Sequence, residues 1–284
     1  TLFPYTTLFR SSKLIEIPSR TIKDGRVVSL IHKYLRSGVM NKGLFEVSEE
    51  GTPQGGPLSP LLSNIMLNEL DKELERRGLP FVRYADDSMI FCKSKRAARR
   101  VKESITRFIE GTLYLKVNKE KTVVSYVRGV KYLGYSFYVM KGKYRLTVHP
   151  KSKAKMKLSL KELTNRSNGW GYVKRKQKLK DYIRGWIGYY HLADMKRFLL
   201  DTDEWLRRRI RMCIWKAWKK PKTKVGNLIK CGIEKYKACE WGNTRKGYWR
   251  IADSPILKVA INNDSLRKAG YPTLMGSYLE WYPK

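Results

Sequence analysis

Two adjacent carboxylates, Asp86 and Asp87, stand between two apolar runs of the sequence. These runs, residues 81–84 and 88–91, are rich in β-branched and aromatic residues, which predicts a hairpin with the aspartates at its turn. Carboxylates on a rigid turn could hold divalent cations for phosphoryl transfer, where two metal ions clamp the attacking and leaving oxygens. Because neighbouring strand side chains point to opposite faces, we expect Asp86 to be the direct ligand and Asp87 the weaker one. A turn without function is the alternative, since aspartate is a favoured turn residue.

A loop with three glycines and three prolines precedes the predicted hairpin, at residues 51–60. Glycines let a backbone approach a ligand closely, and the Gln54 amide can recognise a sugar or a base edge. Apolar residues then follow at 62, 65, 66, 67 and 70, which is the spacing of a helix. A shaped loop, a helix and a carboxylate turn in succession favour a functional site over a plain turn.

In these motifs the chain resembles the reverse transcriptase domain of bacterial group II intron-encoded proteins, which are reverse transcriptases and maturases. The stretch TPQGGPLSPLLSNIMLNELD followed by YADD carries the resemblance. Residues 115–122 resemble the lysine-bearing segment after the catalytic hairpin, and residues 130–135 resemble the primer-grip turn. The segment IRGWIGYY, residues 183–190, resembles the signature of the maturase, or X, domain that forms the polymerase thumb. The likeness runs from about residue 13 to the end of the chain.

The expected fold class is α+β: a polymerase palm, made of an antiparallel sheet with helices, followed by a helical thumb or maturase domain. Periodicity predicts helical structure over residues 13–42, 63–71 and 97–110, and three or four short strands over 113–148. It also predicts a helix over residues 204–220, starting at Asp203 and stopping before Pro221.

Composition changes near Lys141, because fifteen Lys or Arg and only two acidic residues occupy positions 141–184. We therefore place a domain boundary there, between a partial palm at residues 13–145 and a thumb or maturase domain at 146–222. A basic C-terminal subdomain is expected at residues 223–284, and residues 1–12 are expected to be a non-native segment.

The resemblance implies a reaction in which a primer 3′-hydroxyl attacks a dNTP on an RNA template, with Mg²⁺ held by Asp86 and Asp87. It places substrate contacts at Gln54, Gly55, Gly56, Tyr84 and Lys121, and the primer grip at Tyr132, Leu133 and Gly134. Tyr84 would pack beneath the turn, or serve simply as a core aromatic. For Lys121 the sequence alone favours a plain surface lysine. Among the thumb aromatics Trp186, Tyr189 and Tyr190, packing is favoured over RNA contact.

Sixty Lys and Arg against twenty-five Asp and Glu give a net charge of +35, which predicts a polyanionic partner. No stretch approaches the roughly 18 consecutive apolar residues of a membrane-spanning helix, so nucleic acid is favoured over a membrane. The resemblance makes group II intron RNA that partner. We expect RNA contacts from Lys174, Arg175, Lys176, Arg184, Arg207, Arg208 and Arg211, with the tryptophans at 205, 215 and 218 available to stack on unpaired bases.

Cysteine usage bears on the compartment. The four cysteines form no CxxC pair, and with only three histidines a structural zinc site is not expected. A reduced setting fits best, and we expect a cytoplasmic bacterial ribonucleoprotein.

A splicing cofactor that binds intron RNA without catalysis is the rival function. The basic thumb and tail would serve it equally well. The YADD turn and its glycine loop favour the polymerase, because a pure binder needs no pair of exposed carboxylates amid so much positive charge. The two functions can coexist in one parent protein.

The family resemblance calls for a further metal-binding aspartate on an upstream strand, and no acidic residue before Thr52 has that context. These residues are Glu16, Asp24, Glu46, Glu49 and Glu50, of which Asp24 is expected to be a surface or cap residue.

We therefore expect little or no polymerase activity from the 284-residue chain alone. A missing metal ligand leaves charge uncompensated in the transition state, and each loss of about 1.4 kcal/mol is tenfold in rate. Primer extension on a primed RNA template with Mg²⁺ and dNTPs measures this activity. Robust cDNA synthesis by the purified chain would refute the expectation.

Overall fold

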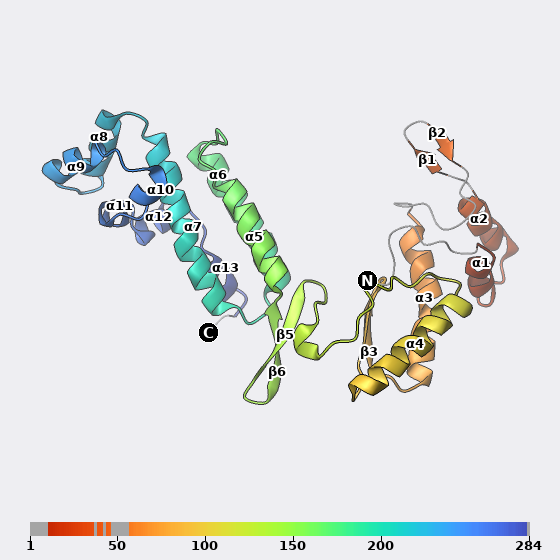
Figure 1. The fold of residues 1–284 in the computed structure, drawn as a ribbon. Coiled ribbons are helices and arrows are strands. Elements are labelled where there is room, and N and C mark those ends of the chain that lie inside the picture. Colours follow the sequence, from red (N-terminus) through yellow and green to blue (C-terminus); the bar gives the residue numbers. More distant parts are fainter. Residues whose placement is uncertain (1–10, 37–38, 42–43, 47–56, 283–284) are drawn as a thin grey trace. The chain divides into compact units, whose positions relative to one another are not determined.

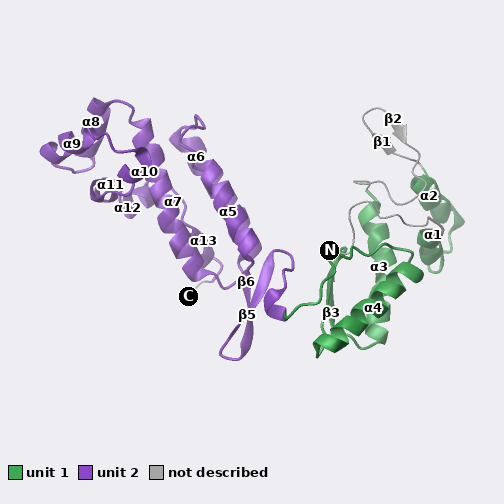
Figure 2. Ribbon diagram, in the orientation of Figure 1, with its two compact units in different colours: residues 1–126 green, residues 127–284 purple. Residues whose placement is uncertain are grey.

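The computed structural model describes residues 11–36, 39–41, 44–46 and 57–282. The chain forms two compact units, residues 1–126 and 127–284 (Figure 2). Each unit has its own hydrophobic core. Helices predominate over the described part of the chain, together with three antiparallel strand pairs (Figure 1), so the α+β expectation is confirmed. The shift in composition near Lys141 falls inside the second unit.

The first unit is built around one long helix whose apolar stripe forms most of its core. This helix, α3, buries Leu62, Met66, Leu67, Leu70 and Leu74, the i, i+4 spacing of one helical face. The elements of this unit are α1 (Ser11–Ser19), α2 (Gly25–Arg36), β1 (Val39–Asn41), β2 (Leu44–Glu46), α3 (Ser59–Arg76), β3 (Phe81–Tyr84), β4 (Asp87–Ile90) and α4 (Lys95–Gly111).

The predicted helix over residues 13–42 is wrong in two places. The chain leaves the helical conformation at residues 20–24, and residues 39–41 form a strand. Asp24 explains the first break, because its carboxylate accepts a hydrogen bond from the Arg26 N–H at 2.8 Å and so caps the start of α2. The expected cap role of Asp24 is therefore confirmed.

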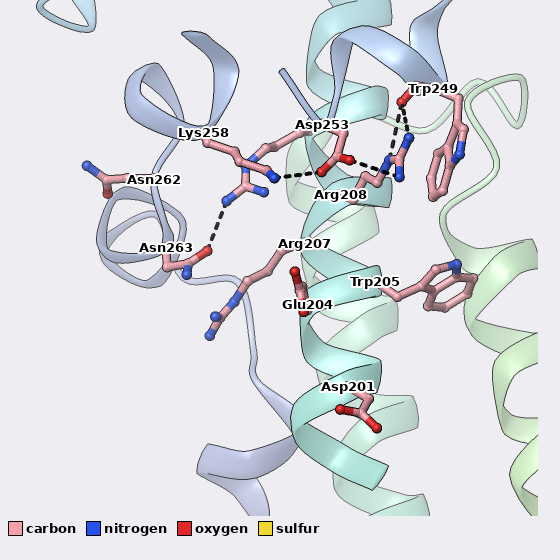
Figure 3. Close-up of a pocket in the computed structure, with 11 residues that line it drawn as sticks. Asp201, Glu204, Trp205, Arg207, Arg208, Trp249, Asp253, Lys258, Asn262 and Asn263 are labelled. Atoms are coloured by element: carbon pink, nitrogen blue, oxygen red, sulfur yellow. Dashed lines mark hydrogen bonds and ion pairs between the residues drawn. The ribbon is translucent and has the colours of Figure 1, made fainter. Parts of the chain in front are cut away.

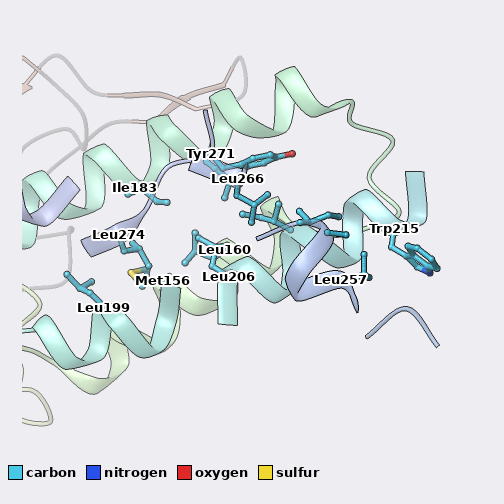
Figure 4. Packing of buried hydrophobic residues seen from close by; sticks show 14 of the residues in the cluster. Met156, Leu160, Ile183, Leu199, Leu206, Trp215, Leu257, Leu266, Tyr271 and Leu274 are labelled. Carbon is cyan, nitrogen blue, oxygen red and sulfur yellow. The ribbon is translucent and has the colours of Figure 1, made fainter. Parts of the chain in front are cut away.

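The second unit is a helical bundle joined to one hairpin. Its core includes Met156 of α5, Ile183 of α6, Leu206 of α7 and Leu274 of α13 (Figure 4). The elements are η1 (Val127–Gly129), β5 (Tyr135–Met140), β6 (Lys143–Val148), α5 (Pro150–Leu163), α6 (Tyr172–Tyr190), α7 (Lys196–Ala217), α8 (Pro221–Lys230), α9 (Lys235–Gly242), α10 (Tyr248–Ile251), α11 (Pro255–Ala260), α12 (Asn263–Lys268) and α13 (Leu274–Leu279).

The expectation of three or four strands over residues 113–148 is wrong, because only β5 and β6 form there. Leu113, Leu115 and Val117 do alternate with exposed residues, as a strand would. They are buried in the core of the first unit, yet no strand pairs with them. The alternation of buried and exposed residues therefore arises because one side of an extended segment is buried, and it does not indicate a strand of a sheet.

The helix predicted over residues 204–220 is longer and placed differently. It starts at Lys196, so Asp203 lies inside it, and Pro221 is the first residue of α8 rather than part of a linker. The buried Asp203 carboxylate accepts hydrogen bonds from the Leu274 and Met275 N–H groups at 2.8 and 2.9 Å. It thereby satisfies two donors at the start of α13, which helices cannot satisfy internally.

Asp203 gives the second unit a pH-dependent term in its stability. Burial raises the pKa of this carboxyl, against a lowering by the Met275 and Leu274 N–H bonds. A raised folded-state pKa contributes stability that is present below the ordinary value of 3.8 and is lost as pH rises through the folded value. Asp203→Asn cannot ionise. Its free energy of unfolding, measured by chemical denaturation, should therefore improve relative to the wild type as pH rises above about 3.

The control for this experiment is Asp264→Asn, at an exposed position on α12. A difference between Asp203→Asn and wild type that stays constant over this pH range would contradict the assignment.

Candidate functional site

The paired carboxylates lie at the closed end of the β3–β4 hairpin, which confirms the predicted hairpin. Tyr84 pairs with Asp87 in the last rung of the ladder, so Ala85 and Asp86 form a two-residue loop. Asp86 is thus a loop residue, whereas Asp87 begins a strand. This difference frees the two neighbouring side chains from the opposite-face rule of a regular strand.

Ala85 holds the loop in an unusual backbone conformation. Its φ is +51°, in the left-handed region that residues other than glycine rarely adopt. Such a conformation costs on the order of 1–3 kcal/mol and persists only where the surrounding structure holds it. The contacts that hold this loop come from the strand before it and from α3.

Arg83 connects the loop to α3. Its guanidinium donates to both carboxylate oxygens of Asp71, at 2.5 to 3.0 Å, and to the Asn64 side-chain oxygen at 3.0 Å. The same guanidinium donates to the Ala85 carbonyl at 2.9 Å. One planar side chain therefore fixes the strained loop residue to two positions seven residues apart on α3.

Sequence reasoning missed Asn64 and Asp71 as parts of this site. The available signal was their spacing of seven residues, which places both on one face of a helix. An arginine two residues before the loop supplies the matching donor.

The donor set at the loop fits Mg²⁺ rather than a protein-enclosed metal site. In the part of the chain that the structure describes, no cluster of three or more His, Cys, Asp and Glu side chains could hold a metal ion. Mg²⁺ does not need one, because it keeps several waters and is bound through one or two carboxylates plus substrate phosphates. Asp86 and Asp87 could supply those carboxylates.

The other residues expected to contact substrate are Tyr84, Lys121 and residues 54–56, and the structure bears on two of these predictions. Tyr84 is 65% exposed, so the expectation that it packs beneath the turn or in the core is wrong. The alternation of β3 explains this, since Val82 and Tyr84 share its exposed face. Lys121 is exposed, as a surface lysine would be, and its N–H donates to the Asn118 side-chain oxygen at 3.0 Å. Gln54, Gly55 and Gly56 lie outside the described residues.

The residues assigned to the primer grip form a tight turn in the second unit. Tyr132 and Tyr135 exchange backbone hydrogen bonds of 3.1 and 2.8 Å around Leu133 and Gly134, which have φ of +49° and +79°. The Tyr189 hydroxyl donates to the Leu133 carbonyl at 3.0 Å. On the other side, the Ser152 hydroxyl donates to the Gly134 carbonyl at 3.1 Å, and a Cβ at Gly134 would collide with the Tyr190 hydroxyl.

Aromatic packing secures the same turn, as expected for the thumb aromatics. The ring of Tyr190 lies 5.2 Å from that of Tyr135 and 4.6 Å from that of Trp186, centroid to centroid. The Tyr135 hydroxyl donates to the Tyr189 carbonyl at 2.5 Å, and burial raises the pKa of this hydroxyl to about 12. Tyr189 itself is 53% exposed. The IRGWIGYY segment therefore supports the turn through packing and hydrogen bonds.

Burial removes two arginines from the expected RNA contacts. Arg175 is 4% exposed and donates to the Asn168 side-chain oxygen at 2.9 Å. Arg211 is 6% exposed and donates to the Ile261 carbonyl at 2.8 Å and to the Asn263 side-chain oxygen at 2.9 Å. Burial also lowers the pKa of Arg211. Both side chains form hydrogen bonds inside the unit. The spacing of charged residues along a helix does not show that these two are buried.

The remaining cations are at or near the surface. Lys174 and Arg184 are exposed, and half-buried Lys176 donates to the Ala269 carbonyl at 2.8 Å. Arg207 and Arg208 are half-buried. Among the tryptophans, Trp215 is buried and cannot stack on RNA, contrary to expectation.

Residues 5–137 match the family described as reverse transcriptase (RNA-dependent DNA polymerase), and residues 153–232 match the group II intron maturase-specific domain. Within the described residues, no helix has the length and apolar character needed to cross a membrane.

Three curated relatives illustrate the likeness. Protein YkfC of Escherichia coli (strain K12) is 31% identical over 166 residues, covering 46% of this chain and 44% of the relative. Group II intron-encoded protein LtrA of Lactococcus lactis subsp. cremoris is 28% identical over 191 residues, or 44% and 32%. Retron Ec86 reverse transcriptase of Escherichia coli is 34% identical over 79 residues, or 26% and 24%. The chain spans less than half the length of these relatives.

The bridge made by Arg83 can be tested with Arg83→Lys. Lysine keeps the charge but presents a point donor, which cannot reach Asp71, Asn64 and the Ala85 carbonyl together. We expect the first unit to lose about 1–3 kcal/mol of stability, and amide hydrogen exchange at residues 85–87 to accelerate.

Arg76→Lys is the matched control, because Arg76 pairs with Glu73 on the same helix but is 71% exposed. Exchange at residues 85–87 that is equally slow in Arg83→Lys and in this control would show that the bridge does not hold the loop.

Proposed function

We propose that this chain serves RNA-directed DNA synthesis and intron RNA binding. The proposal follows from its family, because the chain belongs to the group II intron-encoded reverse transcriptases with a maturase domain. The first unit would carry the catalytic carboxylates. The second unit would bind group II intron RNA, in support of splicing and mobility. The observation that carries the polymerase assignment is the hairpin loop with Asp86 and Asp87, held by Arg83.

The chain's own residues suit polymerisation in three ways. Asp86 and Asp87 would hold Mg²⁺ on a loop that α3 keeps in place. When bound, Mg²⁺ would neutralise charge on the dNTP phosphates and the attacking primer oxygen. Lys121, exposed beyond the hairpin, would meet the departing pyrophosphate. Gln54, Gly55 and Gly56 would line the template and nucleotide side, and Tyr132, Leu133 and Gly134 would position the primer end.

The second unit supports RNA binding by its charge. Exposed lysines line α5, at Lys151, Lys155, Lys157 and Lys161, and Lys174 and Arg184 are exposed on α6. Phosphate contacts of this kind supply most of the affinity for nucleic acid and make it steeply salt-dependent. Because these residues lie outside the hairpin, binding can persist without catalysis. A splicing cofactor is therefore the second candidate function, favoured by the maturase-specific match.

Asp86→Ala separates the two functions. Mn²⁺, used as a paramagnetic probe for Mg²⁺, should bind the whole chain in the presence of a dNTP and enhance water proton relaxation. We expect this enhancement to fall strongly in Asp86→Ala and less in Asp87→Ala. RNA affinity and its salt slope should stay unchanged in both variants, since no phosphate-binding cation is lost.

Asp264→Ala serves as the control for a carboxylate removed elsewhere. Mn²⁺ binding that is equal in the wild type and Asp86→Ala would refute the metal assignment. A chain whose RNA binding does not weaken with salt would refute the RNA assignment.

A further inference from the structure

A cavity of about 620 Å³ opens in the second unit between α7 and the chain around α10 to α12 (Figure 3). Its volume falls in the range of roughly 300–1,000 Å³ that is usual for small-ligand sites. Four cations and three carboxylates line it, so its charge is nearly balanced. This balance distinguishes the cavity from the rest of a chain that carries +35.

One wall of the cavity is built from charges that satisfy each other. Asp253 accepts from Arg208 at 3.1 Å and from Lys258 at 2.9 Å. Arg208 also donates to the Trp249 carbonyl at 2.9 Å and lies 3.9 Å from the centre of the Trp249 ring. With Arg211 bonded to Ile261 and Asn263, these cations hold the wall in shape.

Three further charged residues of α7 line the cavity without an ion pair to a described residue. Asp201, Glu204 and Arg207 follow each other at three-residue intervals on α7 and line the cavity (Figure 3). In Figure 3 no dashed line joins any of the three to another residue drawn, although burial and Arg207 lower, and Glu204 raises, the pKa of the neighbouring Arg211. Glu204 does not pair with Arg207 or Arg208, although its spacing from both commonly gives ion pairs on a helix.

These three side chains define what could fill the cavity. The helical rise places Asp201 and Arg207 about 9 Å apart along the axis. A complementary ligand therefore has a hydrogen-bond donor edge for the carboxylates and, separated from it, an anionic group for Arg207. A flat group would suit the exposed side of the Trp249 indole, which is 38% exposed at the cavity rim and whose other face is covered by the Arg208 guanidinium. A cationic ligand would meet the carboxylates alone, and the +35 chain would repel it.

We propose that this cavity binds an unpaired guanine nucleotide of a single-stranded nucleic acid. Guanine carries two adjacent donors on its pairing edge, N1–H and the 2-amino group, which match the two acceptor oxygens of Glu204. Adenine and cytosine offer only an amino donor beside a ring acceptor that a carboxylate repels. Arg207 receives the phosphate, and the face of Trp249 that Arg208 leaves uncovered supplies the stacking surface, the usual means of holding splayed bases. This inference rests on the proposed RNA-binding function, and it identifies an unpaired guanine as the group that the second unit recognises.

The test uses the whole chain and fluorescein-labelled ten-residue oligouridines that carry one central guanine, adenine or cytosine, with affinities measured by anisotropy. We expect the guanine oligonucleotide to bind about tenfold more tightly than the other two. In Glu204→Gln this preference should disappear, because the amide turns an N–H group toward guanine N1–H. Affinity for plain oligouridine and its salt slope should not change.

Two further variants complete the test. Glu162→Gln, an exposed glutamate of the same unit outside this cavity, should keep the guanine preference. Arg207→Ala should weaken all oligonucleotides alike and reduce the salt slope by about 1. A deoxyguanosine-containing oligothymidine tests the source of the base: an equal preference there means that the site reads the base in RNA and DNA alike, and a preference confined to RNA means that it also reads the ribose.

The outcomes separate the two proposals. Salt-dependent binding with equal affinity for all three RNAs would overturn the guanine site and leave RNA binding intact. A guanine preference that survives in Glu204→Gln would also overturn it. The absence of binding to every oligonucleotide would refute the proposed function together with this site.

Discussion

The ion pair between Arg83 and Asp71 is the constraint on which the candidate catalytic loop depends. A two-residue loop that begins with an alanine at φ +51° is not a conformation the local sequence favours. The guanidinium compensates by bonding α3 and the loop carbonyl at once. Functional sites commonly hold backbone strain that the surrounding scaffold stabilises, and here the scaffold is a helix that buries five apolar side chains.

In the second unit, too, charged side chains hold the structure in place. Some of its charged residues are buried and bond the interior, whereas others are exposed at the surface. Asp203 caps α13 from seventy-one residues away, and Arg175 and Arg211 bond side-chain and backbone oxygens in the interior. Each of these buried side chains has hydrogen-bond partners, as burial of a charged group requires, although the Arg175 Nε finds none among the described residues. Exposed lysines on α5 and α6 remain for phosphate. Net charge alone therefore overstates how many cations can meet RNA.

Sequence patterns predicted the elements whose signals are local. The hairpin at residues 81–90 and the helices α3 and α4 follow from alternation and helical period. They could not show that the alternation at 113–117 lacks a partner strand, because pairing depends on distant residues. Nor could they show that Asp203 caps another helix, or that Arg175 and Arg211 are buried. The carboxylate pair was found from its motif, whereas its Asn64 and Asp71 support required the fold.

The turn at residues 132–135 is bonded on both sides to helices of the second unit, through Ser152 of α5 and Tyr189 of α6. A motif assigned by resemblance to the polymerase palm thus shares one body with the maturase signature. Any truncation designed to isolate a palm by cutting the chain near residue 145 would sever β6 and strip this turn of its supports. Domain dissection of such proteins is better guided by the junction near residue 126, where the compact units divide.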